Sequence, residues 1–196
     1  MDIRQIFFKN RSYTPIPIAL MIIYFTGTAN TFRFPGVLLL LIGEAIRIWA
    51  VSHAGGATRT LNVGAPSLCT SGPYALSRNP LYLGNMFMYI GIVIIAGIQN
   101  GLFMVVLTAA FFLIQYTLIV SLEEETLDNL FGKKYLEYKK HVPPIIPRLK
   151  PWSGAKQTKP ATLLQTLNTE KRTLQNVSLI LLLIYIKSNN VFLSLN

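Results

Sequence analysis

The residues best suited to chemistry fall in two short clusters that are far apart in the sequence. Arg78-Asn79-Pro80 opens one apolar segment, and Glu123-Glu124-Glu125 follows another. Because proline fits the first turn of a helix, Pro80 predicts a helix start whose free N–H groups favour a carboxylate or a phosphate. Arg78 adds a forked cation beside that helix start. The carboxylates of the second cluster could bind an ammonium group. The two clusters together would therefore fit a zwitterionic amino-acid group.

These charged residues also have simpler interpretations. Arg78 can reach lipid headgroups along its apolar stem, and the acidic run at Glu123 can be an ordinary solvated helix segment. Glu44 and Arg47 form a third charged group inside an apolar segment, where they share one helix face. They fit either a self-neutralising pair that helps helices assemble or the polar wall of a substrate cavity.

Apolar segments must position these clusters, and a helix needs roughly 20 largely apolar residues to cross a membrane. Four segments satisfy this pattern: Pro15–Phe32, Phe34–Ala54, Leu81–Ile98 and Leu102–Ser121. Only Gln99-Asn100-Gly101 separates the last two, so they predict an antiparallel hairpin. The hairpin returns Glu123 to the side of the bundle that holds Arg78.

The C-terminal third of the chain has a different character. Apolar residues repeat with helical spacing from Leu127 to Tyr138, which predicts an amphipathic interfacial segment rather than another span. Residues 151–196 are predicted to form a polar linker and a further apolar segment, Leu174–Leu193. This segment would be a fifth transmembrane span if it crosses the membrane. The predicted fold is therefore an all-α, polytopic membrane bundle of four or five transmembrane helices, with its core in residues 1–150.

The composition supports a membrane protein, because 52% of the 196 residues are hydrophobic and only 13% are charged. The net charge of +10 lies around the apolar segments, which argues against a nucleic-acid binder. The high apolar content argues against disorder. Lys and Arg gather before the first segment, between the second and third, and after the fourth. The N-terminus and the chemistry-bearing loops are therefore predicted to be cytoplasmic. One cysteine and two histidines offer no paired metal-ligand motif.

Several motifs in order resemble the isoprenylcysteine carboxyl methyltransferase and phospholipid methyltransferase superfamily over roughly residues 36 to 150. They are Thr70-Ser71-Gly72-Pro73-Tyr74, the block from Arg78 to Gly84, Glu123-Glu124, Phe131-Gly132 and Val142-Pro143. The resemblance implies a bilayer enzyme whose cofactor is S-adenosylmethionine, held between helix ends and cytoplasmic loops. The lack of a strand, Gly-rich turn and helix fingerprint agrees with a site that has no Rossmann domain.

The resemblance also implies the cofactor contacts, whereas the charges of the sequence suggest the catalytic and acceptor-side residues. Cofactor contacts are expected at Ser67, Leu68, Cys69, Tyr74, Asn79, Pro80, Leu81, Tyr82, Glu123 and Glu124. Arg78 is expected to act in catalysis by orienting an anionic group. Glu44, Arg47 and Arg59 are expected on the acceptor side.

The chain departs from the superfamily pattern at two positions. Asn79 stands where the family commonly has His, and Asn can donate a hydrogen bond but cannot carry a proton. Ile119 stands where the isoprenylcysteine enzymes have an Arg that engages the substrate carboxylate. We therefore expect a lipophilic acceptor other than a prenylcysteine carboxylate, unless Arg47, Arg59 or Arg78 supplies the cation.

The predicted function is S-adenosylmethionine-dependent methyl transfer to a lipophilic acceptor that enters from the bilayer. The main alternative is a non-catalytic membrane scaffold whose basic tail binds anionic lipid. A transporter is a third alternative, although the absence of a visible internal repeat gives it little support.

Overall fold

The computed structural model describes residues 2–27, 33–56 and 63–189, and within these ranges the chain is helical without strands. Arg59, one of the predicted acceptor-side residues, lies outside the described residues. The helices are α1 (Ile3–Lys9), α2 (Ile16–Phe25), α3 (Phe34–Ala54), α4 (Pro80–Ile95), α5 (Gly101–Phe131), α6 (Lys133–His141) and α7 (Leu163–Ser188), with a 3₁₀ turn η2 (Gly72–Ala75).

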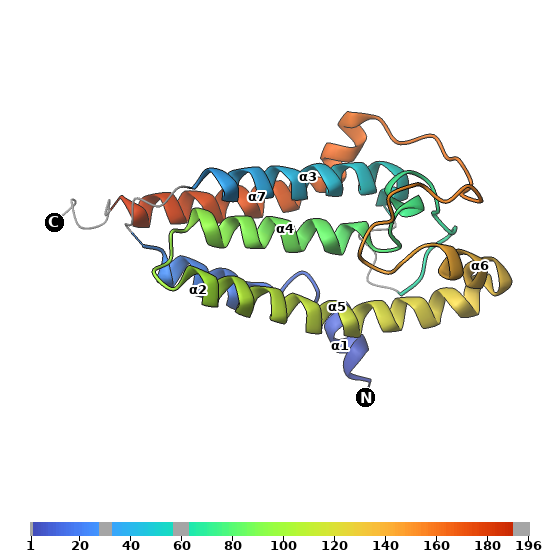
Figure 1. Cartoon of the computed structure of the whole chain (residues 1–196), viewed down its shortest axis with the longest axis horizontal. Helices are drawn as coiled ribbons and strands as arrows, with labels where there is room; N and C mark the ends of the chain where they lie inside the picture. Colours follow the sequence, from blue (N-terminus) through green and yellow to red (C-terminus); the bar gives the residue numbers. More distant parts are fainter. Residues whose placement is uncertain (1, 28–32, 57–62, 190–196) are drawn as a thin grey trace.

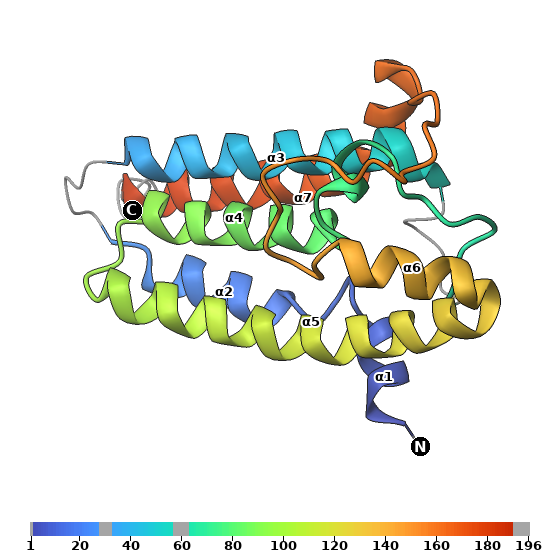
Figure 2. The same ribbon diagram turned by 45° about the vertical axis from the view of Figure 1, so that its right-hand side comes forward.

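The long helices run along one common direction, and the connecting segments divide between two ends of the bundle (Figure 1). One end, which we call the loop end, holds η2, α6 and the start of α7. The opposite end holds the start of α3, the α4–α5 connection and the end of α7. Figure 2 shows α1 beside α5 and α7 alongside α3. The predicted hairpin of α4 and α5 is present, and it brings both chemical clusters to the loop end.

Glycines allow α3 and α4 to pack backbone to backbone. A Cβ atom built on Gly43 would lie 2.6 Å from the carbonyl oxygen of Gly84, and one on Gly91 would lie 2.7 Å from that of Gly36. Larger residues at these positions would push the helices apart. This is the small-residue packing that replaces the hydrophobic driving force between helices in a membrane.

The buried core uses α7 as well as the helices that precede it. Ile22, Ile92, Met104 and Ile184, from α2, α4, α5 and α7, are at most 3% exposed and form one cluster. A second cluster joins Phe8 of α1 to the loop-end half of α5. Residues 163–188 are therefore part of the bundle rather than a polar tail.

Large apolar side chains also point outwards, including Leu41 and Trp49 on α3 and Phe103 and Ile114 on α5. Two described helices, α3 and α5, are long and apolar enough to cross a membrane. The helices α2 and α4 have 10 and 16 residues, so they are shorter than the predicted spans Pro15–Phe32 and Leu81–Ile98. Residues 28–32 lie outside the described ranges.

Two predicted boundaries are wrong. The helix α5 continues to Phe131, ten residues past the predicted end of the span at Ser121. The predicted interfacial segment is therefore divided between the end of α5 and α6. The last helix starts at Leu163, not near Leu174, because Thr162 forms a capping box with Gln165.

Candidate active site at the loop end

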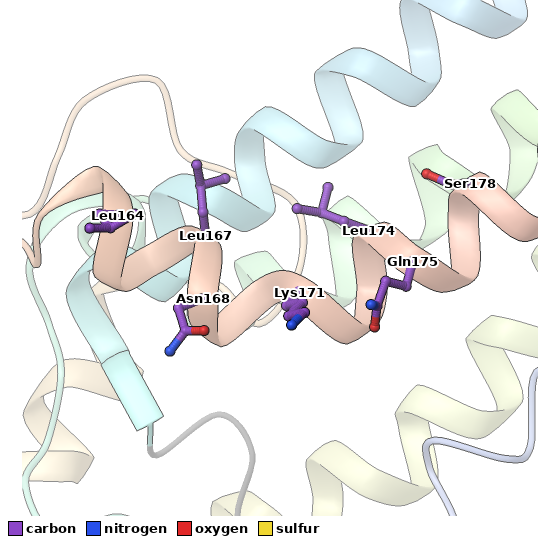
Figure 3. Close-up of a pocket in the computed structure, with 7 residues that line it drawn as sticks. All are labelled: Leu164, Leu167, Asn168, Lys171, Leu174, Gln175 and Ser178. Carbon is purple, nitrogen blue, oxygen red and sulfur yellow. The ribbon is translucent and has the colours of Figure 1, made fainter.

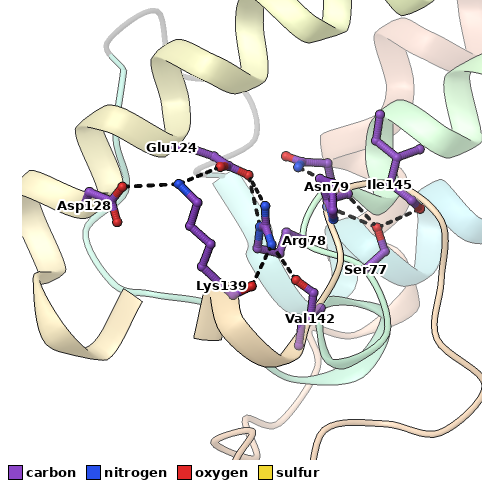
Figure 4. A network of polar contacts seen from close by, with 9 residues as sticks. Ser77, Arg78, Asn79, Glu124, Asp128, Lys139, Val142 and Ile145 are labelled. Atoms are coloured by element: carbon purple, nitrogen blue, oxygen red, sulfur yellow. Dashed lines mark hydrogen bonds and ion pairs between the residues drawn. The ribbon is translucent and has the colours of Figure 1, made fainter. Parts of the chain in front are cut away.

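The two clusters that the sequence singled out meet through an ion pair (Figure 4). Arg78, just before α4, donates from Nη2 and Nε to Oε1 of Glu124 on α5, at 2.5 and 3.0 Å. Lys139 of α6 lies 3.0 Å from the other carboxylate oxygen of Glu124. The expected proximity of these clusters is confirmed.

The remaining contacts of Arg78 are internal too. Its Nη1 donates to the backbone carbonyls of Lys139 and Val142, at 3.1 and 2.5 Å, and its side chain is 8% exposed. Four hydrogen bonds to one carboxylate and two carbonyls hold α6 and the following turn against α5. In this arrangement the Arg78 guanidinium braces the loop end, and its role in orienting an anionic group stays a prediction.

Residues 142–162, which we call the strap, bond to the two residues that precede α4, beside the predicted anion site. The backbone N–H groups of Arg78 and Asn79 donate to the carbonyls of Pro143 and Pro144, at 2.9 and 3.1 Å. The Asn79 side-chain amide also donates to Pro144, at 3.0 Å. Asn79 therefore fastens the strap to the start of α4.

The strap continues along the rest of the segment that resembles a cofactor site. Trp152 donates its backbone N–H to Ala75, and Lys156 donates its backbone N–H to the Thr70 hydroxyl, both at 3.0 Å. The hydroxyl of Tyr138 donates to the carbonyl of Tyr74 at 2.7 Å, and both tyrosines are buried. Burial raises the pKa of the Tyr138 phenol, so this hydroxyl stays protonated and remains a donor.

The predicted cofactor residues before η2 differ in exposure. Ser67 is exposed, whereas Leu68 and Cys69 are half-buried. Leu68 packs against the cluster of Tyr135, Tyr138 and Val142. Burial raises the pKa of the Cys69 thiol, so less of the reactive thiolate is present at neutral pH than for a free cysteine.

Glu123 has different surroundings from its two acidic neighbours. The Tyr82 hydroxyl donates to both of its carboxylate oxygens at 3.0 Å, and the Tyr82 ring stacks on Tyr116 at 4.4 Å between centroids. Glu125 is exposed and pairs with Arg4 of α1 at 2.7 Å. Glu123 and Glu124 therefore have different partners, with Glu123 held by an aromatic pair and Glu124 by Arg78.

Asp128 is a candidate that the sequence reasoning missed. It lies one helical turn after Glu124, and its Oδ2 atom lies 3.4 Å from Lys139. Its Oδ1 atom is buried and has no hydrogen-bond partner among the described residues. Buried carboxylate oxygens usually have a donor, so this atom marks a place where a ligand donor would fit. The only available signal was its i+4 spacing from Glu124.

Arg47 has a partner that the sequence reasoning did not name. Its Nη2 atom lies 2.6 Å from Oε2 of Glu170 on α7, and it also donates to Thr173 at 3.2 Å. Arg47 therefore forms its ion pair with Glu170 and not with Glu44, the nearer partner that the sequence suggested. Glu44 is half-buried on the same helix.

Two open hollows on the surface are lined by other residues. Figure 3 shows the first, along α7, lined by Leu164, Leu167, Asn168, Lys171, Leu174, Gln175 and Ser178. The second lies between α3 and the start of α7, beside Trp49 and Leu163. Neither lining includes a predicted cofactor residue. In the part of the chain that the structure describes, no three His, Cys, Asp or Glu side chains gather as metal ligands.

The chain is similar over part of its length to several curated proteins. The protein-S-isoprenylcysteine O-methyltransferase of Xenopus laevis is 33% identical over 119 residues, which cover 59% of this chain and 40% of that protein. The human enzyme of that name is 33% identical over 124 residues, covering 59% and 41%. The cobalt-zinc-cadmium resistance protein CzcN of Cupriavidus metallidurans is 29% identical over 124 residues, covering 63% and 51%.

The chain thus spans about half the length, or less, of these relatives. No solved structure gives a significant match. The profile of the phospholipid methyltransferase family matches residues 31–134, which is more than half of the chain and includes both Arg78-Asn79-Pro80 and the acidic cluster. The chain therefore belongs to the phospholipid methyltransferase family.

Proposed function

We propose that the protein is an S-adenosylmethionine-dependent methyltransferase of the membrane, acting on a lipophilic acceptor that enters from the bilayer. Family membership and the relatives named as isoprenylcysteine methyltransferases support this activity more than a non-catalytic scaffold. The observation that carries the proposal is the Glu123 carboxylate, which Tyr82 holds with both oxygens at the loop end. The distribution of Lys and Arg along the sequence supports a cytoplasmic position for the loop end.

The residues present fit the cofactor. S-adenosylmethionine has an ammonium group and ribose hydroxyls as donors, and Glu123 and the buried Oδ1 atom of Asp128 are acceptors at the same end of α5. The remaining proposed cofactor contacts are Ser67, Leu68, Cys69, Tyr74, Asn79, Pro80, Leu81 and Tyr82. When bound, the cofactor supplies an electrophilic methyl group on a sulfonium.

The protein's contribution is then mainly orientation. Methyl transfer needs the acceptor atom in line with the methyl group, and holding two reactants in place can lower a barrier substantially. The Arg78–Glu124 ion pair and the strap fix the ends of α4, α5 and α6 relative to one another. Glu124 serves this brace in our proposal, while Glu123 faces the cofactor.

The acceptor is proposed to be neutral or amine-bearing rather than a carboxylate. Ile119 is fully buried in an apolar cluster with Phe8 and Phe112. Arg47 and Arg78 are each paired with a buried or largely buried carboxylate. Unless Arg59, which lies outside the described residues, supplies the cation, a substrate carboxylate would have to break one of these pairs or remain unpaired, and either costs several kcal/mol.

The test uses purified protein in lipid nanodiscs with S-adenosylmethionine labelled in its methyl group. Candidate acceptors are a farnesylcysteine analogue, an amine-bearing phospholipid and a hydrophobic phenol. We expect label in a neutral or amine acceptor, with transfer abolished by Glu123→Gln and kept by Glu125→Gln. Efficient methylation of the farnesylcysteine carboxylate would contradict the proposed acceptor class, and transfer to none of the acceptors would count against the activity.

A further inference from the structure

A series of contacts leads from α7 through one turn of α4 to the proposed cofactor carboxylate. It begins at Glu170, which is completely buried and pairs with Arg47 at 2.6 Å. Arg47, 7% exposed, donates from Nη1 to the side-chain oxygen of Asn85 on α4. This contact fixes the orientation of the Asn85 amide, because its oxygen is committed to the guanidinium.

The second half of this series runs through α4 and two aromatic rings. Asn85 and Tyr82 lie three residues apart on α4, so they share one face of that helix and Arg47 holds the turn that carries Tyr82. Tyr116, 2% exposed, stacks on Tyr82 with 25° between the ring planes. The Tyr82 hydroxyl then holds Glu123. Four helices, α7, α3, α4 and α5, therefore contribute to the position of one carboxylate.

The ion pair at the start of this series calls for an explanation other than stability. Two charges removed from water gain little net free energy, and apolar residues of the same size often stabilise a fold as well. A buried pair that is also hydrogen-bonded to its neighbours, as Arg47 is to Asn85 and Thr173, can instead select one arrangement of those neighbours. Here those neighbours lead to Glu123.

We propose that Glu170 is a positioning residue for the Glu123 carboxylate, acting through Arg47, Asn85 and the turn of α4 that carries Tyr82. The helix that carries Glu170 lies outside the family match at residues 31–134, so the proposal assigns a role to a part of the chain that the family does not cover. The consequence for S-adenosylmethionine rests on the proposed function, whereas the coupling between Glu170 and Tyr82 does not.

A double-mutant cycle tests the coupling through the affinity for S-adenosylmethionine, measured by titration calorimetry. We expect Glu170→Gln and Tyr82→Phe each to weaken binding by about fivefold to tenfold. The affinity of the double variant should be no lower than that of whichever single variant binds more weakly. Glu170→Asp, which keeps the carboxylate, should retain most of the affinity. Effects that multiply in the double variant would overturn the proposal.

Thr166→Ala is the matched control on α7. Thr166 is also buried, but its hydroxyl bonds the carbonyl of Thr162 within its own helix. We expect it to leave S-adenosylmethionine affinity unchanged alone and to add nothing to Tyr82→Phe. A loss equal to that of Glu170→Gln would mean that any change in α7 disturbs the site, and it would overturn the specific role of Glu170.

Glu170→Gln can leave Arg47 as an unpaired buried charge, so a second variant guards against misfolding. Replacing both Arg47 and Glu170 by Met removes the charges and keeps the volume, which is expected to preserve folding. This double variant should still bind at least fivefold more weakly than the wild type. Wild-type affinity in this variant would overturn the proposal.

A second readout needs no cofactor. A second double-mutant cycle uses thermal unfolding midpoints without ligand. It compares the wild type with Glu170→Gln, Tyr82→Phe and the double variant. We expect non-additive shifts, because the two residues share one network. Additive shifts would overturn the inference even if S-adenosylmethionine binds, and a wild type that binds none would count against the proposed function alone.

Discussion

At Glu123, Glu124 and Glu125, the direction of each side chain around α5 decides which partner it meets. The first meets Tyr82, the second Arg78 and the third Arg4. Three adjacent residues of similar chemistry therefore have three roles: a candidate ligand, a brace and a surface ion pair. Exposed ion pairs such as the third add little stability.

Replacing Arg78 by Met separates bracing from substrate contact. The change leaves Glu124 largely buried beside Lys139 alone and removes two bonds to backbone carbonyls. We expect a loss of about 3 kcal/mol of unfolding free energy, as for other broken buried pairs, measured by denaturant or thermal unfolding in detergent.

Arg148→Met is the control for this variant. Arg148 is also on the strap side of the loop end, but its side chain makes an exposed bond to the carbonyl of His141. It should unfold within about 0.5 kcal/mol of the wild type. If Arg78→Met were equally stable yet lost methyl transfer, Arg78 would have the substrate-facing role that the sequence suggested.

Cys69, the one cysteine of the chain, provides a direct probe of the site. Because burial raises its pKa, the thiolate fraction at pH 7 to 8 is smaller than in a free thiol and grows as the pH rises. We expect alkylation by iodoacetamide to be slower than for free cysteine at pH 8 and to accelerate above pH 9.

S-adenosylmethionine should slow the alkylation of Cys69 further by covering the segment from Ser67 to Cys69. The reaction is followed by mass spectrometry with and without cofactor, and with S-adenosylhomocysteine as a second ligand. An alkylation rate that is indifferent to both ligands would place Cys69 outside the cofactor site.

At the scale of elements, the contact between α3 and α4 depends on glycine. Gly91→Ala places a Cβ atom 2.7 Å from the backbone oxygen of Gly36, and backbone cannot rotate away as a side chain can. We expect a destabilisation of about 1 to 3 kcal/mol by thermal unfolding. Gly101→Ala at the start of α5 meets nothing within 4 Å and should be neutral or slightly stabilising. Equal behaviour of the two variants would contradict the close packing.

The sequence predicted some elements well because their signals are local. The predicted segment Phe34–Ala54 coincides with α3, since proline starts it and Gly55 follows its end. The continuation of α5 past Ser121 was missed because its polar residues there, Glu124 and Asp128, form ion pairs with Arg78 and with Lys139 of α6. Such partners come from elsewhere in the chain and leave no periodic signal.

The same reasoning explains the outcome for the site residues. The meeting of Arg78 with Glu124 followed from one short hairpin, so it was predictable. The pairing of Arg47 with Glu170 joins residues 123 positions apart. Nothing in the apolar pattern places α7 against α3, and the nearer Glu44 was the simpler choice of partner.

For the whole molecule, both chemical clusters must lie on one side of the membrane. Single cysteines at Lys140 and Lys156 in a Cys69→Ala background should be labelled from the same side by an impermeant maleimide, and a cysteine at Asn100 from the other side. The loop end and the α4–α5 connection are at opposite ends of the bundle (Figure 1). Labelling of positions 100 and 140 from one side would contradict a spanning bundle.

The most direct test of the account is calorimetric titration of S-adenosylmethionine into the purified protein. We predict binding by the wild type, a loss of about 1 to 3 kcal/mol of binding free energy in Glu123→Gln, and little change in Glu125→Gln. Both variants make the same chemical change two residues apart, at a carboxylate held by Tyr82 and at an exposed one paired with Arg4. Binding by the wild type with equal losses in the two variants, or no binding by the wild type, would contradict the assignment of a cofactor site at Glu123.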